Sequence, residues 1–218
     1  MKEIGRGLTS RLYTLEENGK TIVKKTFEPV RLLKVLYYLS FQSPYPYSNN
    51  KDALQAAYFT RRIAHKVTKT VLGNNSVADA YGVDLNGHAL YCEFVKGSHS
   101  KSDKHLKEFL GTSEQLLKEA GLPSWHVSRY NPFRERNVLT DTDSNYRIVD
   151  FESGVPFPLW KFDDVNFKQL RVFVKRVQNR LAPDEYTELL REIDKSEFYT
   201  NRWKSSEIAI LRKIQKRL

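Results

Sequence analysis

The sequence predicts an α+β fold with two lobes, in which a strand-rich N-lobe precedes a mainly helical C-lobe. Short apolar runs bounded by turn residues dominate the first 95 residues, and apolar residues with helical spacing dominate the last third. Between them, residues 96–102 are polar and contain glycine, which is the composition of a hinge. We therefore expect the N-lobe at residues 1–97 and the C-lobe at residues 98–218.

The N-lobe is expected to begin with a β-ribbon over its first 27 residues. Asn18-Gly19 lies between two apolar runs, and this dipeptide is a strong signal for the tight turn of a hairpin. An inserted helical stretch follows, in which alanines and valines repeat with helical spacing up to Gly73. The expected elements are a short helix at 29–41, a long helix at 51–72, and strands at 77–83 and 88–95.

The C-lobe is expected to combine helices with a few short strands. Ser102 or Asp103 is a suitable N-terminal cap for its first helix, and Gly121 is a suitable stop. Pro183 opens a later helix whose first turn is acidic, as the positive end of a helix dipole favours. The expected elements are a helix at 103–120, strands around 125–128, 138–140 and 146–150, and an amphipathic helix at 165–181.

The composition is ordinary for a soluble globular protein, with 40% apolar and 28% charged residues. We expect a cytoplasmic location, because the N-terminus lacks an apolar signal sequence and no stretch approaches the roughly 20 apolar residues of a membrane span. The single cysteine, Cys92, excludes an intramolecular disulfide, and its apolar neighbours favour a buried position over a nucleophilic role. The formal charge of +10 favours an anionic partner, such as a nucleotide, a phosphorylated substrate, a nucleic acid or a membrane surface.

The strongest chemical signal is a polar loop that ends in Asn137 and runs into a short apolar strand, followed by a second strand that ends in Asp150. In such a hairpin the two side chains leave adjacent strands on the same side. An amide oxygen and a carboxylate are oxygen ligands of the kind that magnesium prefers, with phosphate and water completing the shell. The alternative is a plain hairpin, in which Asn137 caps a turn and Asp150 is solvated at a strand end.

At these residues the chain resembles the protein-kinase-like superfamily, whose catalytic loop ends in Asn-Val-Leu and whose metal strand ends in Asp-Phe-Gly. It is more similar to the small atypical members, such as antibiotic phosphotransferases and lipopolysaccharide-core sugar kinases, than to regulatory protein kinases. The resemblance extends from residue 3 to about residue 155. It implies a kinase-like fold, ATP and magnesium as cofactors, and Asn137 and Asp150 as the metal ligands.

The N-terminus agrees with this resemblance. Gly5 and Gly7 are similar to the first glycines of a loop that covers the nucleotide phosphates, although Ser10 replaces the third glycine and a simple turn is the alternative. Lys24 best fits the family spacing of the phosphate-binding lysine, with Lys25 as the second choice. Because neighbouring side chains of a strand point to opposite faces, only one of the two lysines can face the cleft.

Three departures from the family pattern put turnover in doubt. Pro132 stands where the catalytic aspartate is expected, and one inserted residue would bring Asn131 there, which can orient a hydroxyl but cannot accept its proton. The helix at 51–72 contains no glutamate for Lys24, which leaves Glu93, Glu152 or the nucleotide phosphates as its partners. Glu152 also replaces the glycine of Asp-Phe-Gly, either as a further metal ligand, a substitute base or a solvated carboxylate.

Several basic residues are candidates for contacts with anions. Arg129, Arg134 and Arg136 surround the catalytic loop, where they either grip an anionic acceptor or are plain surface arginines. The basic amphipathic segment 205–218 either docks on its own domain, lies on an anionic membrane or touches nucleic acid. Residues 31–41 would add a second membrane-facing patch, and the two together favour peripheral contact with the inner membrane face and a lipid or glycolipid acceptor.

The leading functional hypothesis is an atypical phosphotransferase that uses ATP and magnesium and acts on a small molecule, sugar or lipid head group. Its acceptor is expected to be an anionic small molecule, glycan or lipid. The alternative is a pseudokinase that binds a nucleotide or a partner without turnover, because the catalytic aspartate and the helix glutamate are missing. A nucleic-acid-binding protein is disfavoured, since only the charge and the basic tail support it.

Overall fold

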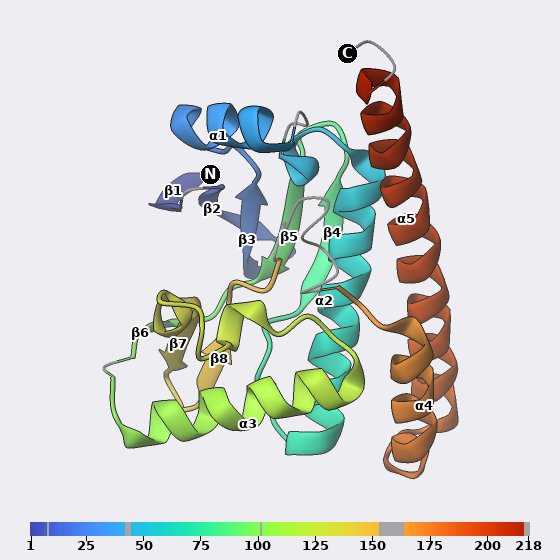
Figure 1. The fold of residues 1–218 in the computed structure, drawn as a ribbon. Coiled ribbons are helices and arrows are strands. Elements are labelled where there is room, and N and C mark those ends of the chain that lie inside the picture. Colours follow the sequence, from blue (N-terminus) through green and yellow to red (C-terminus); the bar gives the residue numbers. More distant parts are fainter. Residues whose placement is uncertain (8, 42–44, 101, 153–163, 216–218) are drawn as a thin grey trace.

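The structure is a computed structural model of the 218-residue chain. It describes residues 1–7, 9–41, 45–100, 102–152 and 164–215. An antiparallel sheet near the N-terminus precedes a part that is mainly helical, so the predicted two-lobed α+β fold is confirmed (Figure 1). The division at residues 97 and 98 stays a prediction.

The first sheet has five strands in the order β1-β2-β3-β5-β4, and every neighbouring pair is antiparallel. Asn18 and Gly19 both adopt positive φ angles, 52° and 74°, in the turn between β2 and β3, which confirms the predicted hairpin. The strands of this sheet are β1 (Lys2–Arg6), β2 (Arg11–Glu17), β3 (Lys20–Thr26), β4 (Ala80–Asp84) and β5 (Ala89–Glu93).

Two helices are inserted between β3 and β4, as the sequence predicts. They are α1 (Arg31–Phe41) and α2 (Lys51–Leu72), with the short 3-10 helix η1 (Pro46–Ser48) between them. The Asn50 side chain caps α2 by accepting hydrogen bonds from two backbone amides of its first turn. The helix ends at Gly73, whose φ of 72° places it in the left-handed conformation that favours glycine.

The second sheet has three strands, β6 (Gly97–His99), β7 (Val138–Asp141) and β8 (Tyr146–Ile148), in that order. Strand β6 lies within residues 96–102, where the sequence predicts a polar hinge and no strand. A Cβ atom on Gly97 would lie 2.1 Å from the carbonyl oxygen of Thr140, so the close approach of β6 to β7 requires glycine at this position.

The predicted strand at 125–128 is also wrong, because Trp125–Val127 forms the 3-10 helix η2. The amides of Val127 and Ser128 donate to carbonyls three residues earlier, which closes the turn in place of a strand ladder. A second 3-10 helix, η3 (Arg134–Asn137), leads directly into β7. The segment that precedes β7 is therefore built from short turns.

Helices make up most of the remaining chain. They are α3 (Lys104–Ala120), α4 (Phe167–Val177), the 3-10 helix η5 (Gln178–Arg180) and α5 (Pro183–Gln215). Figure 1 shows α5 running along α2, the first sheet with α1 at one end of the molecule, and α3 with the second sheet at the other. No helix among the described residues is long and apolar enough to cross a bilayer.

The helix α2 joins two hydrophobic cores. Its N-terminal half contributes Ala53, Leu54 and Ala57 to a cluster beneath the first sheet, which also contains Phe27 and Leu90. Its C-terminal half contributes Ile63, Ala64 and Val67 to a larger cluster with α3, α4, α5 and the second sheet. Because one rigid helix is buried in both cores, the two sheets are held in a defined relationship, and a cavity lies between them.

Candidate functional site

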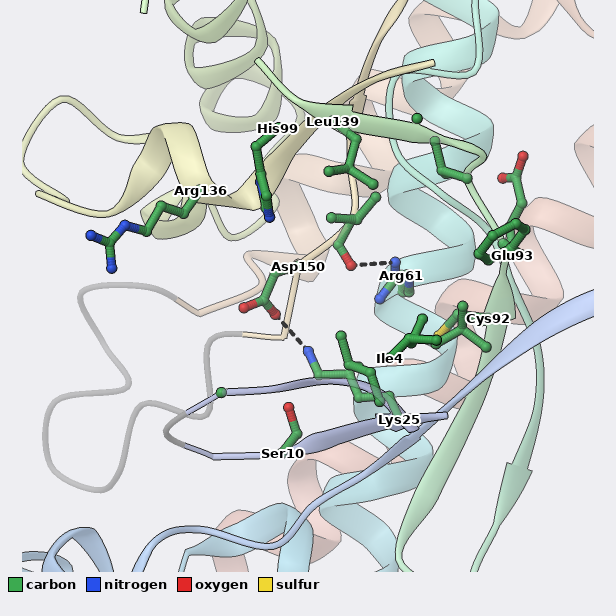
Figure 2. A pocket seen from close by; sticks show the side chains of 17 residues that line it. Ile4, Ser10, Lys25, Arg61, Cys92, Glu93, His99, Arg136, Leu139 and Asp150 are labelled. Carbon is green, nitrogen blue, oxygen red and sulfur yellow. Dashed lines mark hydrogen bonds and ion pairs between the residues drawn. The ribbon is translucent and has the colours of Figure 1, made fainter. Parts of the chain in front are cut away.

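The cavity between the two sheets has a volume of about 310 Å³. Its walls are mostly apolar, and Lys25 and Asp150 face each other within it, with Arg136 on one side and Glu93 on the other (Figure 2). The apolar lining residues come from both sheets and the segment between them: Ile4, Leu12, Val23, Phe94, Val95, Leu139 and Val149. An apolar slot beside a charged end suits a ligand with one flat apolar part and one polar part.

Lys25, and not Lys24, lines this cavity, so the predicted choice between the two lysines is corrected. Strand β3 pairs Lys25 with Leu12, and the pocket-lining Val23 lies two residues earlier on the same face. Lys24 points to the opposite face, where its Nζ lies 2.9 Å from Oδ2 of Asp84. The spacing from the glycine loop predicts the strand correctly but not which of its faces meets the cleft.

Lys25 is held by two carboxylates. Its Nζ lies 2.5 Å from Oδ1 of Asp150 and 2.6 Å from Oε2 of Glu152. The Lys25 side chain is 6% exposed and that of Glu152 is 1% exposed, whereas Asp150 keeps 44% exposure. Of the two partners of Lys25, Asp150 is therefore the one that a ligand in the cavity can reach.

Arg61 of α2 completes the charged network. Its Nη1 lies 2.6 Å from Oε1 of Glu152, while its other nitrogens donate to the carbonyl oxygens of Ala78 and Val149. The guanidinium is 1% exposed, and three hydrogen bonds to fixed acceptors hold it in place. Glu152 thus bridges a lysine from the first sheet and an arginine from the long helix.

Sequence reasoning missed Arg61. In the kinase-like pattern the helix supplies a glutamate to the strand lysine, whereas here the helix supplies a cation and Glu152 supplies the carboxylate. Two unusual features of the sequence occur together: a helix without glutamate, and an acid in place of the glycine after Asp150. Together these two features indicate that the helix supplies a cation and that the residue after Phe151 supplies the carboxylate, which is the signal that could have identified Arg61.

The four side chains of the network are all ionised near neutral pH. Burial opposes ionisation of Glu152, but Arg61 and Lys25 outweigh it and hold the pKa of this carboxyl well below its ordinary value. Burial also opposes ionisation of Asp150, and mainly Lys25 lowers its pKa. In the same way burial disfavours the Lys25 ammonium, while Asp150 and Glu152 raise its pKa. The positive charges of Lys25 and Arg61 are therefore compensated by the negative charges of Asp150 and Glu152 within this network.

Glu152 consequently has a different role from those predicted for it. Each of its two carboxylate oxygens accepts a hydrogen bond from a cation, one from Lys25 and one from Arg61. A low pKa and two occupied oxygens make it unsuited to accept a proton or to take a metal ion. Its place in the structure is to position Lys25.

Asn137 immediately precedes β7, and Asp150 lies two residues after the end of β8, so the two residues flank the same end of this hairpin. Strand β7 pairs Val138 with Ile148, and the amide of Val149 donates to the carbonyl oxygen of Asn137 at 2.8 Å. The Asn137 side chain donates from Nδ2 to the carbonyl oxygen of His126 at 2.8 Å, and no group among the described residues donates to its Oδ1. Asn137 is buried and is not among the residues that line the cavity.

An amide oxygen and a half-exposed carboxylate fit the oxygen-only ligand set of magnesium. Among the described residues no group of three or more His, Cys, Asp or Glu side chains could hold a metal ion. A cation at this place would therefore depend on phosphate oxygens and water for the rest of its shell.

Asn131 is not brought to the cavity. Its Nδ2 donates to the carbonyl oxygen of Trp125 at 3.2 Å, and its Oδ1 accepts from the amide of Phe133 at 2.9 Å. The residue is buried, and both of its side-chain polar atoms brace the loop that contains it. The structure thus places Asn131 as a loop-stabilising residue and not where it would orient an acceptor hydroxyl.

Gly7 and Ser10 line the cavity at the turn between β1 and β2, where the Gly7 amide donates to the carbonyl oxygen of Ser10 at 2.8 Å. Gly5 lies in β1 and is not among the lining residues. Neither glycine adopts a positive φ. The turn therefore borders the charged end of the cavity, with Gly7 and Ser10 as its contact points.

Glu93 lines the cavity wall, but it does not pair with Lys24. Both of its carboxylate oxygens lie 2.7 Å from Nη2 of Arg147, and one also accepts from the amide of Asp79. The predicted Lys24–Glu93 pair is therefore corrected, because Lys24 lies on the other face of β3 with Asp84.

Cys92 is buried, as predicted, and lines the inner wall of the cavity. Burial raises the pKa of its thiol to about 11. A thiol that stays protonated at neutral pH is a poor nucleophile, so this residue serves to fill the wall.

The fold and the site together define a two-lobed α+β protein with a lysine–carboxylate network in the wall of an interlobe cavity. No protein-family model matches this chain, and no curated protein sequence is significantly similar to it.

Among solved structures, the fold is similar to that of the Rio2 kinase from Chaetomium thermophilum. The ADP/Mg²⁺-phosphoaspartate complex of that kinase is 13% identical, with a TM-score of 0.45 over 100% of this chain and 72% of the kinase. A second structure of the same kinase is 15% identical, with a TM-score of 0.47 over 99% of this chain and 73% of the kinase. Both TM-scores are below 0.5, so the assignment of function depends on the residues of this chain's own site.

Proposed function

We propose that this protein is a kinase-like phosphotransferase that binds ATP and magnesium in the cavity between its two sheets. The observation that carries the proposal is the Lys25–Asp150 ion pair in the wall of a mostly apolar cavity. Asn137 lies beside the cavity wall, where its carbonyl oxygen accepts a hydrogen bond from the amide of the lining residue Val149. A cation for phosphate, a reachable carboxylate and an amide oxygen are the groups that a magnesium–nucleotide complex requires.

The nucleotide base would occupy the apolar part of the cavity. Leu12 and Val23 of the first sheet and Leu139 of the second offer apolar contacts to its two faces. The chain that joins the sheets, including Phe94 and Val95, passes along the cavity edge. Backbone groups there can donate to and accept from a ring edge, which is how a mainly apolar pocket fixes the orientation of its ligand.

The phosphates would lie at the charged end, between Lys25 and the Gly7–Ser10 turn. Asn137 Oδ1 and the Asp150 carboxylate would hold the magnesium ion, which would neutralise part of the phosphate charge. For this to happen Lys25 exchanges its contact with Asp150 for a phosphate oxygen. Glu152 remains on Lys25 during the exchange, because its own second oxygen is tied to Arg61.

In the proposed transfer, an acceptor hydroxyl forms a bond to the terminal phosphorus as the bond from that phosphorus to the leaving ADP oxygen breaks. The acceptor proton passes to water at the open side of the cavity. Such a reaction depends mainly on positioning and electrostatic stabilisation, so the missing catalytic aspartate does not prevent it.

The acceptor class remains the anionic small molecule, glycan or lipid head group that the sequence favours. Arg136 supports an anionic acceptor, because it lines the cavity with an exposed side chain beside the ring of Phe133. In Figure 2 it lies on the same side of the cavity as His99 and Asp150. A cytoplasmic location fits the expected source of ATP.

A second candidate is a pseudokinase, which binds the nucleotide without turnover. The observation that favours it is the position of Asn131, whose side chain is committed to Trp125 and Phe133 and does not line the cavity. The two candidates share the nucleotide site and differ only in transfer.

Calorimetric titration of the full chain with ATP and ADP, with and without millimolar magnesium, tests the site. We expect binding that is strengthened by magnesium, and we expect Asp150→Asn to remove the magnesium effect while the fold is kept. The proposal would be abandoned if neither nucleotide bound in the presence of magnesium. Binding without ATP hydrolysis or transfer to a panel of sugars, lipids and small metabolites would select the pseudokinase.

A further inference from the structure

We propose that the exposed face of α1 is a docking surface for an anionic lipid bilayer. This inference goes beyond the proposed nucleotide chemistry and does not depend on it, because none of the α1 side chains that the structure describes lines the cavity.

The helix presents large apolar side chains to solvent. Leu32 is 69% exposed, Val35 is 48% exposed and Tyr38 is 64% exposed. Their spacing of three residues places them on one side of the helix. Single exposed apolar residues are ordinary, but three on one face of an eleven-residue helix form a patch that a partner is expected to cover.

The charge of this segment identifies the partner. Arg31 and Lys34 are exposed on the same helix, and no acidic residue occurs between Glu28 and Asp52. An apolar face with a basic border is complementary to a bilayer of anionic lipids. A second copy of the chain is a poorer partner, since a symmetric contact through α1 would bring the basic side chains of both copies together.

The position of α1 supports the same partner. Figure 1 shows α1 at the end of the molecule opposite α3, and the C-terminal end of α5 reaches the same end. A flat anionic surface at this end would meet both helices, whereas a small protein ligand of α1 alone would leave the end of α5 uncovered.

Co-sedimentation of the full chain with vesicles tests the surface. We expect binding to vesicles of phosphatidylcholine with phosphatidylglycerol, weak binding to phosphatidylcholine alone, and a decrease as salt concentration rises. The double variant Leu32→Ser/Tyr38→Ser should lose at least about tenfold in apparent affinity. The charge reversal Arg31→Glu/Lys34→Glu should abolish the preference for phosphatidylglycerol.

The matched control is Val172→Ser/Phe198→Ser, which changes two apolar residues of 56% and 54% exposure on α4 and α5. It should bind vesicles as the wild type does, and circular dichroism should show the same fold and melting in all variants. The proposal is overturned if the wild type does not bind anionic vesicles. It is also overturned if the control loses as much binding as the Leu32→Ser/Tyr38→Ser variant. It is also overturned if the wild type is a dimer that the α1 variant dissociates, because a second copy would then cover α1.

Discussion

Lys25 and Glu152 form an ion pair of 2.6 Å between Nζ and Oε2, and both side chains are almost completely buried. This pair joins the first sheet to the segment that follows the second sheet. The lysine of the candidate site is therefore positioned by the same stretch of chain that carries the candidate metal ligand Asp150.

Replacement of Lys25 tests which lysine serves the nucleotide. Lys25→Met should weaken ATP binding at least about tenfold, since a charge-assisted hydrogen bond to phosphate contributes about 1.5–3 kcal/mol. The neighbouring variant Lys24→Met should leave ATP affinity unchanged and cost at most about 1 kcal/mol of stability through its pair with Asp84. Calorimetric titration measures both, and equal losses in the two variants would contradict the assignment.

Glu152→Gln should destabilise the fold by about 3–5 kcal/mol, because it leaves two buried cations with one fewer carboxylate. Arg61→Met/Glu152→Gln should be less destabilised than the sum of the two single variants, since the first change removes a cation that the second leaves unpaired. Urea unfolding monitored by tryptophan fluorescence gives the four free energies of this cycle. Additive effects would show that the two residues do not act as a pair.

The network should also make stability depend on pH. The pKa values of Asp150 and Glu152 are lowered in the folded state, so their contribution is present above the ordinary carboxyl pKa of about 4 and is lost as pH falls. The pKa of Lys25 is raised, so its contribution is present below the ordinary lysine pKa of about 10.4 and is lost as pH rises further.

The difference in unfolding free energy between the wild type and Glu152→Gln should therefore stay constant from about pH 5 to about pH 9. Below about pH 4 it should shrink by about 1.4 kcal/mol for each pH unit. Urea unfolding at a series of pH values measures this difference. A difference independent of pH down to about pH 2 would show that the carboxylate charge of Glu152 is not what stabilises the fold.

Asn131→Ala should lower stability by about 1–2 kcal/mol, because it removes the hydrogen bonds to Trp125 and Phe133. Nucleotide affinity should be unchanged, since Asn131 does not line the cavity. Thermal unfolding and nucleotide titration of the same preparation separate the two effects. A loss of ATP affinity with an unchanged melting temperature would show that Asn131 contributes to nucleotide binding and not only to the stability of its loop.

Much of the fold could be predicted because it depends on local signals. The turn at Asn18 and Gly19, the stop at Gly73 and the cap at Asp103 each depend on a residue's own conformation or on a neighbour a few residues away. The 3-10 helix at Trp125–Val127 was missed because a short apolar run without periodicity cannot be distinguished from a strand.

The candidate site was predicted in part for the same reason. Asn137 and Asp150 lie on one hairpin, so their spacing predicts that they are close. The choice between Lys24 and Lys25 depends on the register of β3 against its neighbours, which spacing along one chain does not define. The pairing of Arg61 with Glu152 joins residues 91 positions apart, and only tertiary packing brings them together.

The bridge from Arg61 to Glu152 constrains how this protein can change over evolutionary time. Loss of either residue alone leaves a buried charge without its partner, which costs several kcal/mol and is enough to unfold a marginally stable domain. Substitutions at the two positions should therefore occur together. Among homologous sequences, an arginine in the long helix should accompany an acid at the position of Glu152, and a glutamate in that helix should accompany a glycine there.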